Sequence, residues 1–250
     1  MESNLEPSTL TIQVRHASKI ILTPPQHSDG PAVLLALNDP RVYTKLNGPP
    51  YPYQEKDWEE WYPTISNASA SALEDFKVAQ EERTRYGSAT KGVGRTMWPF
   101  SIRQVTQPNN SGGEEQRWIG EISIQRGSFL YIVEEDEREK RKEQNDSLEP
   151  GDPRIIWEIG FYLIPEYHGR GIMPAVLQTL MHRLFVPYMN AKTIRATYFE
   201  YNSASRRVFE KCGFHFLMFV PDAITLSKTK TGDHTPRKLG LGVMEWTQDT

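Results

Sequence analysis

The chain contains a single cysteine, Cys212, among its 250 residues. One thiol cannot form an internal disulfide, which excludes the small domains that depend on a disulfide framework. Cys212 lies within a predicted helix and has no recognisable histidine partner. We therefore interpret it as a buried packing residue and not as a nucleophile.

Long apolar runs are also lacking. No stretch reaches the ~18 apolar residues of a membrane-spanning helix. Residues 1–9 are polar and acidic, without the basic region and apolar core of a secretory signal. We expect these residues to form a flexible tail, and we expect a cytoplasmic protein with no membrane partner, without excluding the nucleus.

A surplus of positive charge is absent as well. Lys and Arg total 29 against 32 Asp and Glu, which gives a net charge of −3. General nucleic-acid binders normally carry a basic surplus or patch, so we expect no nucleic-acid partner. We also expect no metal. The length suits one domain, and the charged stretch 134–153 is expected to be a solvated surface insertion, as an irregular loop.

The most informative stretch begins with a predicted strand at 155–164, which is rich in β-branched and aromatic residues and ends before Pro165. A turn with two glycines, Gly169 and Gly171, follows. Apolar residues then recur at helical spacing from 172 to 185. The pattern predicts a strand, a glycine turn and a helix in sequence.

Glycines at the start of a helix leave backbone N–H groups free to bind phosphate, aided by the positive end of the helix dipole. Arg170 adds positive charge to this turn. Pro174 occupies the position of the third glycine of a dinucleotide fingerprint, and no Gly-Lys-Ser/Thr follows. The turn therefore predicts a phosphate site that is neither a dinucleotide fingerprint nor a P-loop.

A second half follows this turn. Residues 193–199 alternate as a strand, a short helix begins at Asn202 and ends at Gly213, and 214–220 predicts another strand. The order of elements, the Gly-Arg-Gly loop and the Asn-led segment that ends in Glu-Lys-Cys-Gly-Phe resemble the GNAT superfamily of N-acetyltransferases. Over 155–220 they look most like the branch that contains ribosomal-protein N-terminal acetyltransferases.

The resemblance implies a single α/β (α+β) domain over 1–250, with a mixed, twisted sheet flanked by helices on both faces and splayed central strands. It implies acetyl-CoA as co-substrate. The residues that it places around the coenzyme are Phe161, Leu163, His168, Gly169, Arg170, Gly171, Ile172, Met173, Asn202 and Arg206. The chain departs from the family pattern at His168, at Met173 and at Phe209, where many members carry an acid tyrosine.

Acetyl transfer requires a neutral amine, donors for the oxyanion and aligned reactants. Glu158 is our first candidate for the general base, because a carboxylate on a mostly apolar strand has a raised pKa. Glu121 and Glu200 are second choices. Ser205 or Tyr198 is expected to protonate the leaving thiolate, although solvent is an alternative.

The acceptor is expected between segments 47–62 and 221–238, by analogy with the family. Five aromatic residues of the first segment either wall this site or serve ordinary packing: Tyr51, Tyr53, Trp58, Trp61 and Tyr62. We expect helices at 54–62 and 68–85, a long polar loop at 221–238 and a closing strand at 239–246.

Three functions stay open on the sequence. The first is an amine N-acetyltransferase acting on a small molecule or a peptide N-terminus, as a monomer or homodimer. The second is a non-catalytic acyl-CoA-binding module, which the unusual His168, Met173 and Phe209 favour. The third is a protein-modifying enzyme docked on a ribosome or on chromatin.

Overall fold

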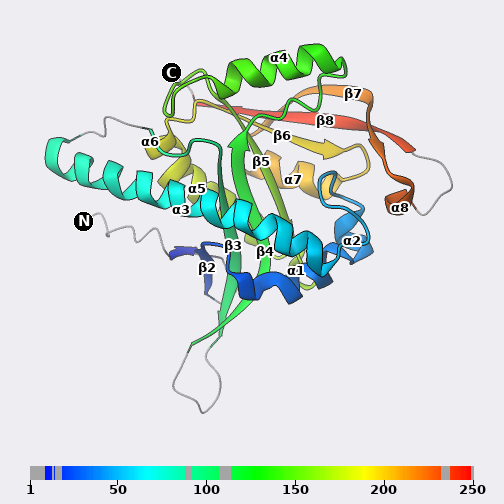
Figure 1. The fold of residues 1–250 in the computed structure, drawn as a ribbon, viewed down its shortest axis with the longest axis horizontal. Helices are drawn as coiled ribbons and strands as arrows, with labels where there is room; N and C mark the ends of the chain where they lie inside the picture. Colours follow the sequence, from blue (N-terminus) through cyan, green and yellow to red (C-terminus); the bar gives the residue numbers. More distant parts are fainter. Residues whose placement is uncertain are drawn as a thin grey trace.

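A computed structural model describes residues 9–12, 14, 19–87, 92–106, 114–231 and 237–248. The expected tail at 1–9 lies outside these residues except for Thr9. The eight strands of the sheet follow the order β1-β2-β3-β4-β5-β6-β8-β7 (Figure 1). They are β1 (Leu10–Ile12), β2 (Ile20–Thr23), β3 (Met97–Thr106), β4 (Glu115–Arg126), β5 (Ile156–Leu163), β6 (Thr193–Phe199), β7 (His215–Leu226) and β8 (Arg237–Thr247).

The helices are α1 (Gly30–Leu37), α2 (Pro40–Tyr43), α3 (Glu55–Tyr86), α4 (Glu135–Asp146), α5 (Ile172–Leu180), α6 (Val186–Met189), α7 (Ser203–Lys211) and α8 (Lys228–Thr231). Two 3₁₀ turns, His27–Asp29 and Pro165–Tyr167, and a π-helical turn, Met181–Phe185, complete the regular elements. In Figure 1, α3 passes in front of the sheet and α5 lies behind it. The mixed sheet with helices on both faces confirms the predicted fold class.

The two central strands, β5 and β6, pair over a short stretch and then diverge. β5 and β6 run parallel and pair only from Ile156 with Thr193 to Glu158 with Arg195. Beyond this point β5 continues to Leu163 and β6 to Phe199 without pairing with each other. The predicted splay is therefore present, and it opens the sheet beside the glycine loop.

The two helices expected at 54–62 and 68–85 form one helix, α3, of 32 residues with Pro63 inside it. Proline lacks an N–H and destabilises a helix interior by roughly 3 kcal/mol. However, Pro63 is exposed, while a continuous stripe from Trp58 through Ile65 to Phe76 is buried. Burial of this stripe outweighs the local break, so the prediction of two helices is wrong.

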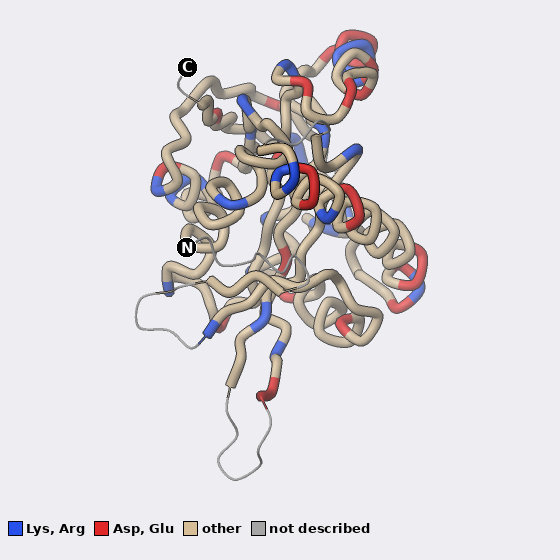
Figure 2. Tube along the Cα trace, turned by 90° about the vertical axis from the view of Figure 1, so that its left-hand side faces the viewer, with Lys and Arg blue, Asp and Glu red and all other residues tan. Residues whose placement is uncertain are grey.

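Residues 135–146 of segment 134–153 form helix α4, where we expected a solvated surface loop. Figure 2 shows acidic and basic residues around this helix at the top of the molecule. Its buried residue is Asn145, whose amide exchanges hydrogen bonds of 3.0 and 2.8 Å with the carbonyl and N–H of Ile156 in β5. Arg126 of β4 donates to the Asn145 carbonyl at 2.6 Å. A charged helix is thus fixed to the sheet by polar contacts.

The loop expected at 221–238 is largely regular structure as well. β7 continues to Leu226 and pairs with β8 as far as Arg237, and α8 follows β7. Residues 232–236 of this segment lie outside the described part of the chain.

Apolar side chains fill three clusters. The largest joins β3, β4, β5 and β6 to α5 and the second half of α3, and the second lies between α1 and the start of α3. Beside the second cluster, Arg103 and Asp29 form a buried ion pair at 2.8 Å.

Within the described residues, no helix combines the length and apolar character needed to cross a membrane.

Candidate coenzyme and acetyl-transfer site

The glycine loop lies between the end of β5 and the start of α5, as predicted. Gly169 and Gly171 both have φ of +73°, and a Cβ on either would meet open space. Side chains therefore have room at these positions, but the backbone conformation is one that L-residues other than glycine adopt at a cost of roughly 1–2 kcal/mol. Gly171 is the N-cap of α5, so the unpaired N–H groups of the first helical turn open into the loop.

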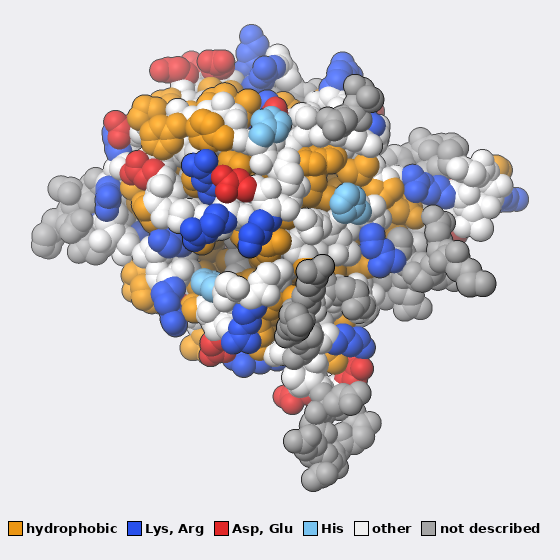
Figure 3. Space-filling model, turned by 180° about the vertical axis from the view of Figure 1, so that it is seen from behind, with side chains coloured by type: hydrophobic (Ala, Val, Ile, Leu, Met, Phe, Trp, Pro, Cys, Tyr) orange, Lys and Arg blue, Asp and Glu red, His pale blue; other side chains and the backbone are white. Residues whose placement is uncertain are grey.

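This loop borders a cavity of about 300 Å³. The lining residues come from α2 and the chain after it, from β5, from the glycine loop with the start of α5, and from α7. They are Arg41, Val42, Lys45, Leu46, Phe161, Tyr162, Leu163, Tyr167, His168, Gly169, Gly171, Ile172, Met173, Pro174, Asn202, Ala204, Ser205, Arg207, Val208 and Lys211. Among them are four Lys and Arg side chains, Arg41, Lys45, Arg207 and Lys211, and no carboxylate. The rear face of the molecule carries a group of Lys and Arg side chains with apolar residues around it (Figure 3).

Most residues expected around the coenzyme meet in this lining: Phe161, Leu163, His168, Gly169, Gly171, Ile172, Met173 and Asn202. Arg170 and Arg206 do not line it. The guanidinium of Arg170 lies over the ring of Tyr167 at 5.1 Å, and Arg206 donates to Glu210 at 2.8 Å. Both side chains lie on residues next to the cavity, where they contribute charge without forming its wall.

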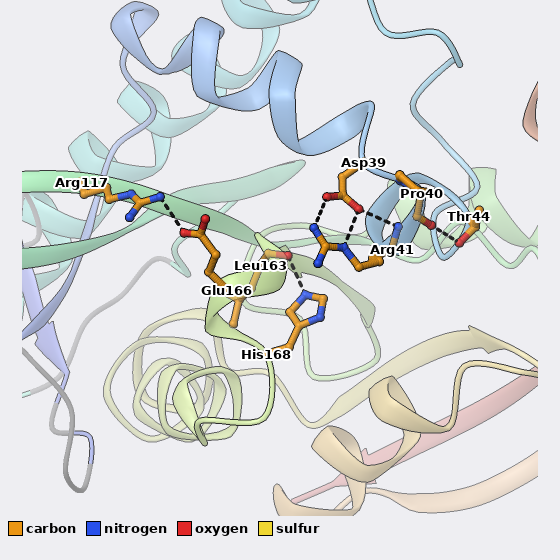
Figure 4. Close-up of polar contacts among 8 residues, drawn as sticks. All are labelled: Asp39, Pro40, Arg41, Thr44, Arg117, Leu163, Glu166 and His168. Atoms are coloured by element: carbon orange, nitrogen blue, oxygen red, sulfur yellow. Dashed lines mark hydrogen bonds and ion pairs between the residues drawn. The ribbon is translucent and has the colours of Figure 1, made fainter.

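His168 turns back toward the strand. Its Nε2 lies 2.8 Å from the carbonyl oxygen of Leu163, so the ring carries its proton on this nitrogen and donates it (Figure 4). Beside this pair, Arg41 of α2 is held by Asp39 at 2.6 Å, and the arginine lowers the pKa of that carboxyl. A histidine in the loop thus fixes the end of β5 at the cavity wall.

Asn202 begins α7 and also lines the cavity. Its side chain accepts from the N–H of Ser205 at 3.3 Å and donates to Ser205 Oγ at 2.9 Å. A capping role for Asn202 in α7 and a role in the cavity wall are therefore compatible. Because Ser205 Oγ accepts from Asn202, its own proton stays available for a group in the cavity.

Tyr198 and Phe209 lie elsewhere. The Tyr198 ring packs against Gly242 of β8 and does not line the cavity. Phe209 is buried, 5.2 Å from Phe161 and 5.3 Å from Phe214, ring centre to ring centre. It fills the core at the position where many members of the family carry tyrosine.

Glu158 is buried beneath the chain that follows β4. Its carboxylate accepts from the N–H of Ser128 at 2.7 Å and from Ser128 Oγ at 2.5 Å. Burial raises the pKa of Glu158, and these hydrogen bonds oppose the shift. Glu158 does not line the cavity, and Glu200 is exposed after the end of β6.

Glu121 on β4 lies opposite Tyr162 of β5, which does line the cavity. Burial raises the pKa of Glu121 to about 7, and Tyr162 opposes this as a hydrogen-bonding neighbour. The pKa of Tyr162 is raised well above its usual value by burial and by the nearby carboxylate. Of the three candidate bases, Glu121 is the one next to the cavity wall.

The aromatic residues expected at an acceptor site are mainly occupied by packing. Tyr53 and Trp58 are buried in the second cluster, and Trp58 Nε1 donates to the His27 carbonyl at 3.3 Å. Tyr51 stacks on Tyr43 at 3.9 Å. Tyr62 contacts Trp58, whereas Trp61 is 45% exposed. None of the five lines the cavity.

One wall was missed by sequence reasoning. α2 and the residues after it supply Arg41, Lys45 and Leu46 to the cavity. Asp39 caps α2 and Pro40 is its first residue, a start signal that the sequence contains. No local pattern, however, could show that this helix lines the same cavity as α7.

Two contacts from the C-terminal half hold this wall in place. Tyr201 Oη donates to the Thr44 carbonyl at 2.5 Å. Lys230 Nζ donates to the carbonyls of Leu46 and Asn47 at 2.9 and 2.7 Å. Lys230 is buried, and desolvation lowers its pKa to about 8.

Among the described residues, no cluster of three or more His, Cys, Asp or Glu has metal-binding geometry.

Solved structures with this fold include RimL, a ribosomal L7/L12 α-N-protein acetyltransferase in complex with coenzyme A (16% identity, TM-score 0.55, covering 95% of this chain and 98% of that one). RimJ from Mycobacterium smegmatis in complex with CoA-disulfide has 16% identity and a TM-score of 0.56, over 96% and 86% of the two chains. The ribosomal-protein-S5-alanine acetyltransferase from Vibrio fischeri has 13% identity and a TM-score of 0.55, over 96% and 97%. No curated protein sequence matches this chain significantly.

At these identities the structural likeness shows the fold alone. The sequence itself matches a family model, the acetyltransferase (GNAT) domain, over residues 19–215. This match spans the sheet from β2 to the start of β7, including the glycine loop and the Asn202 segment. The resemblance found in the sequence is confirmed, and the chain belongs to the GNAT acetyltransferase family.

Proposed function

We propose that this protein is an acetyl-CoA-dependent N-acetyltransferase. It transfers the acetyl group to the primary amine of a small molecule or a peptide N-terminus, by direct attack while both substrates are bound. The observation that carries the proposal is the pair of left-handed glycines at the start of α5, opening into a cavity with positive side chains and no carboxylate.

The loop from His168 to Met173 holds the coenzyme diphosphate. Its unpaired N–H groups and the positive end of the α5 dipole face the cavity, which is the usual design of a phosphate site. Lys45, Arg207 and Lys211 add positive charge around the same space. Arg170 and Arg206 act from just outside it.

The pantetheine arm runs along the part of β5 that β6 no longer covers. A backbone N–H at Phe161 or Tyr162 stabilises the oxyanion, since donors in a water-poor site are effective there. Ser205 donates a proton to the leaving thiolate through the hydroxyl that Asn202 orients. Alignment of the two substrates supplies much of the rate.

A peptide acceptor is supported by the solved relatives, of which RimL modifies the α-amine of a ribosomal protein. A free small amine is an equal candidate for this chain. We further propose a cytoplasmic or nuclear enzyme, monomeric or homodimeric, that needs no metal, nucleic acid or membrane. Docking on a ribosome or chromatin is a separate possibility, which co-purification with such assemblies would test.

The second candidate is a non-catalytic acyl-CoA-binding module. Two observations favour it. Phe209 fills the core at the position where many family members carry the tyrosine that protonates the thiolate. His168 donates a hydrogen bond to the Leu163 carbonyl at the cavity wall, so that this carbonyl is already engaged. Such a module would bind the coenzyme without turnover.

Calorimetry with acetyl-CoA, followed by thiol release with a panel of peptides and small amines, separates these functions. Binding with release that depends on the acceptor supports the transferase. Binding without release across the panel supports the module, and absence of binding contradicts both.

A further inference from the structure

The central strands carry an open position on the face covered by α1 and α3. Ser123 of β4 lies opposite Gly160 of β5. Gly160 is exposed, and a Cβ placed on it would meet nothing within 4 Å. Ser123 is also partly accessible. Two neighbouring residues in the middle of an eight-stranded sheet thus face accessible space, immediately before the segment of β5 that lines the cavity.

A carboxylate borders this opening. Along the strands, the next pair on the same face is Glu121 with Tyr162. Glu121 Oε1 and Tyr162 Oη are sealed from solvent, and the two side chains are hydrogen-bonding neighbours. The rest of the Glu121 side chain is partly accessible. Because its side chain is partly accessible beside the opening at Ser123 and Gly160, Glu121 is positioned to accept a proton from a group bound there.

The charged and titratable groups around Glu121 leave it without a counter-ion. Asp29 lies near it, but the charge of Asp29 is taken by Arg103 at 2.8 Å, and Ser101 donates to Asp29 at 2.9 Å. Tyr53, before α3, is close enough that the carboxylate helps burial to raise the pKa of this phenol to about 12. Burial and the charge of Asp29 favour the neutral form of Glu121, whereas the hydrogen bond from Tyr162 on β5 favours its anion.

The same environment sets the protonation state. Burial raises the pKa of Glu121 to about 7, so the carboxyl is about half ionised at neutral pH. A general base works best when its pKa lies near the working pH. Geometry and titration therefore agree for this residue.

We propose that the acceptor amine lies over Ser123 and Gly160, and that Glu121 is the catalytic base that takes its proton while Tyr162 positions the carboxylate. This inference rests on the proposed amine acetyltransferase function. It assigns the role to our second choice from the sequence in place of Glu158.

The step balances without any further reactant. The ammonium gives one proton to Glu121, and the lone pair of the neutral amine forms the C–N bond. The C–S bond breaks with its electron pair on sulfur. Ser205 then gives its hydroxyl proton to the thiolate. The nitrogen loses its second proton, which returns to Ser205 through solvent. The products are the amide, the coenzyme thiol and the proton that Glu121 returns to water.

Glu158, opposite Gln125, lies on the same face of the sheet on the other side of Ser123 and Gly160, and it is the alternative candidate for the base. Both are glutamates with raised pKa on one face of the sheet. They differ in their contacts: Ser128 gives two hydrogen bonds to Glu158, whereas the hydrogen-bonding neighbour of Glu121 is Tyr162. This difference makes Glu121→Gln and Glu158→Gln a decisive pair.

The test is the single-turnover rate constant as a function of pH, with coenzyme and acceptor both bound, so that the amine of the free acceptor does not contribute. For the wild type the rate rises with pH through a midpoint near 7. In Glu121→Gln the rate at neutral pH falls at least about 100-fold and the midpoint disappears, while coenzyme affinity is unchanged. Tyr162→Phe shifts the midpoint.

Two results overturn the inference: Glu121→Gln keeps the midpoint, or Glu158→Gln alone removes it. Titration of ¹³C-labelled glutamate carboxyls, assigned with Glu121→Gln, gives a readout that needs no acceptor. A Glu121 midpoint near the ordinary value of about 4.3 also overturns it. If the wild type binds acetyl-CoA yet acetylates no acceptor, the proposed function fails. If the wild type acetylates an acceptor and Glu121→Gln has the same pH profile, only the assignment of Glu121 fails.

Discussion

Gly171→Ala tests the coenzyme site most directly, because the structure supplies a matched control. Gly171 and Gly87 have φ of +73° and +78°, and in both cases a Cβ would meet open space. Gly87 ends α3, away from the cavity, whereas Gly171 lines it. Alanine at either position brings the same backbone strain, of roughly 1–2 kcal/mol, so both variants should lose similar stability.

Only Gly171→Ala should lose coenzyme affinity. If the loop relaxes from the left-handed conformation, at least one N–H turns away from the diphosphate. A hydrogen bond to a charged group is worth roughly 1.5–3 kcal/mol, which corresponds to a Kd increased roughly 10- to 150-fold. Calorimetry with coenzyme A measures the affinities, and urea unfolding measures the stabilities.

Equal affinity in Gly171→Ala and the wild type would refute the phosphate-binding role of the loop. An equal loss in Gly87→Ala would show that general destabilisation, and not the loop, lowers affinity. Either result would leave the fold standing and remove the basis of the proposed function.

Three further predictions concern stability. Arg103→Met leaves the Asp29 carboxylate buried without its partner, and urea unfolding should show a loss of about 3–5 kcal/mol; an apolar replacement of both residues should restore most of it. Asn145→Ala removes the two hydrogen bonds that join α4 to Ile156, and the loss should be about 2 kcal/mol, with increased hydrogen exchange across α4; unchanged exchange would contradict the anchoring role. Lys230 has a folded-state pKa of about 8, below the ~10.4 of an unfolded lysine. The unfolded chain therefore binds more protons between these two pH values, and wild-type stability should rise with pH there relative to Lys230→Met. A stability difference between the two proteins that does not change with pH would show that the ammonium is not desolvated.

Local pattern was sufficient for the segment from β5 to α7. Strand alternation, the left-handed glycines and the Asn202 cap are each set by residues within a few positions of one another. The glycine loop predicted from this pattern lies between β5 and α5, whereas the splay after Glu158 was implied only by the family resemblance. The glycines were informative because the backbone there requires them.

Predictions failed where tertiary contacts overrule local signals. Two helices were expected at 54–62 and 68–85, but the buried stripe of α3 continues across Pro63 between them. Segment 134–153 has the composition of a loop, and its attachment rests mainly on Asn145 and the backbone around it, which no periodicity marks. Glu121 and Glu158 were both candidates in the sequence, and only their partners in space distinguish them.

The contacts that hold α2 against the cavity have a consequence for folding. Tyr201 and Thr44 are 157 positions apart, and Lys230 and Leu46 are 184 apart. Contacts between such distant parts of a chain carry a high closure entropy and are expected to form late. The coenzyme should therefore bind poorly to any intermediate in which the last strands are not yet docked, and recovery of coenzyme binding during refolding would report completion of the native topology.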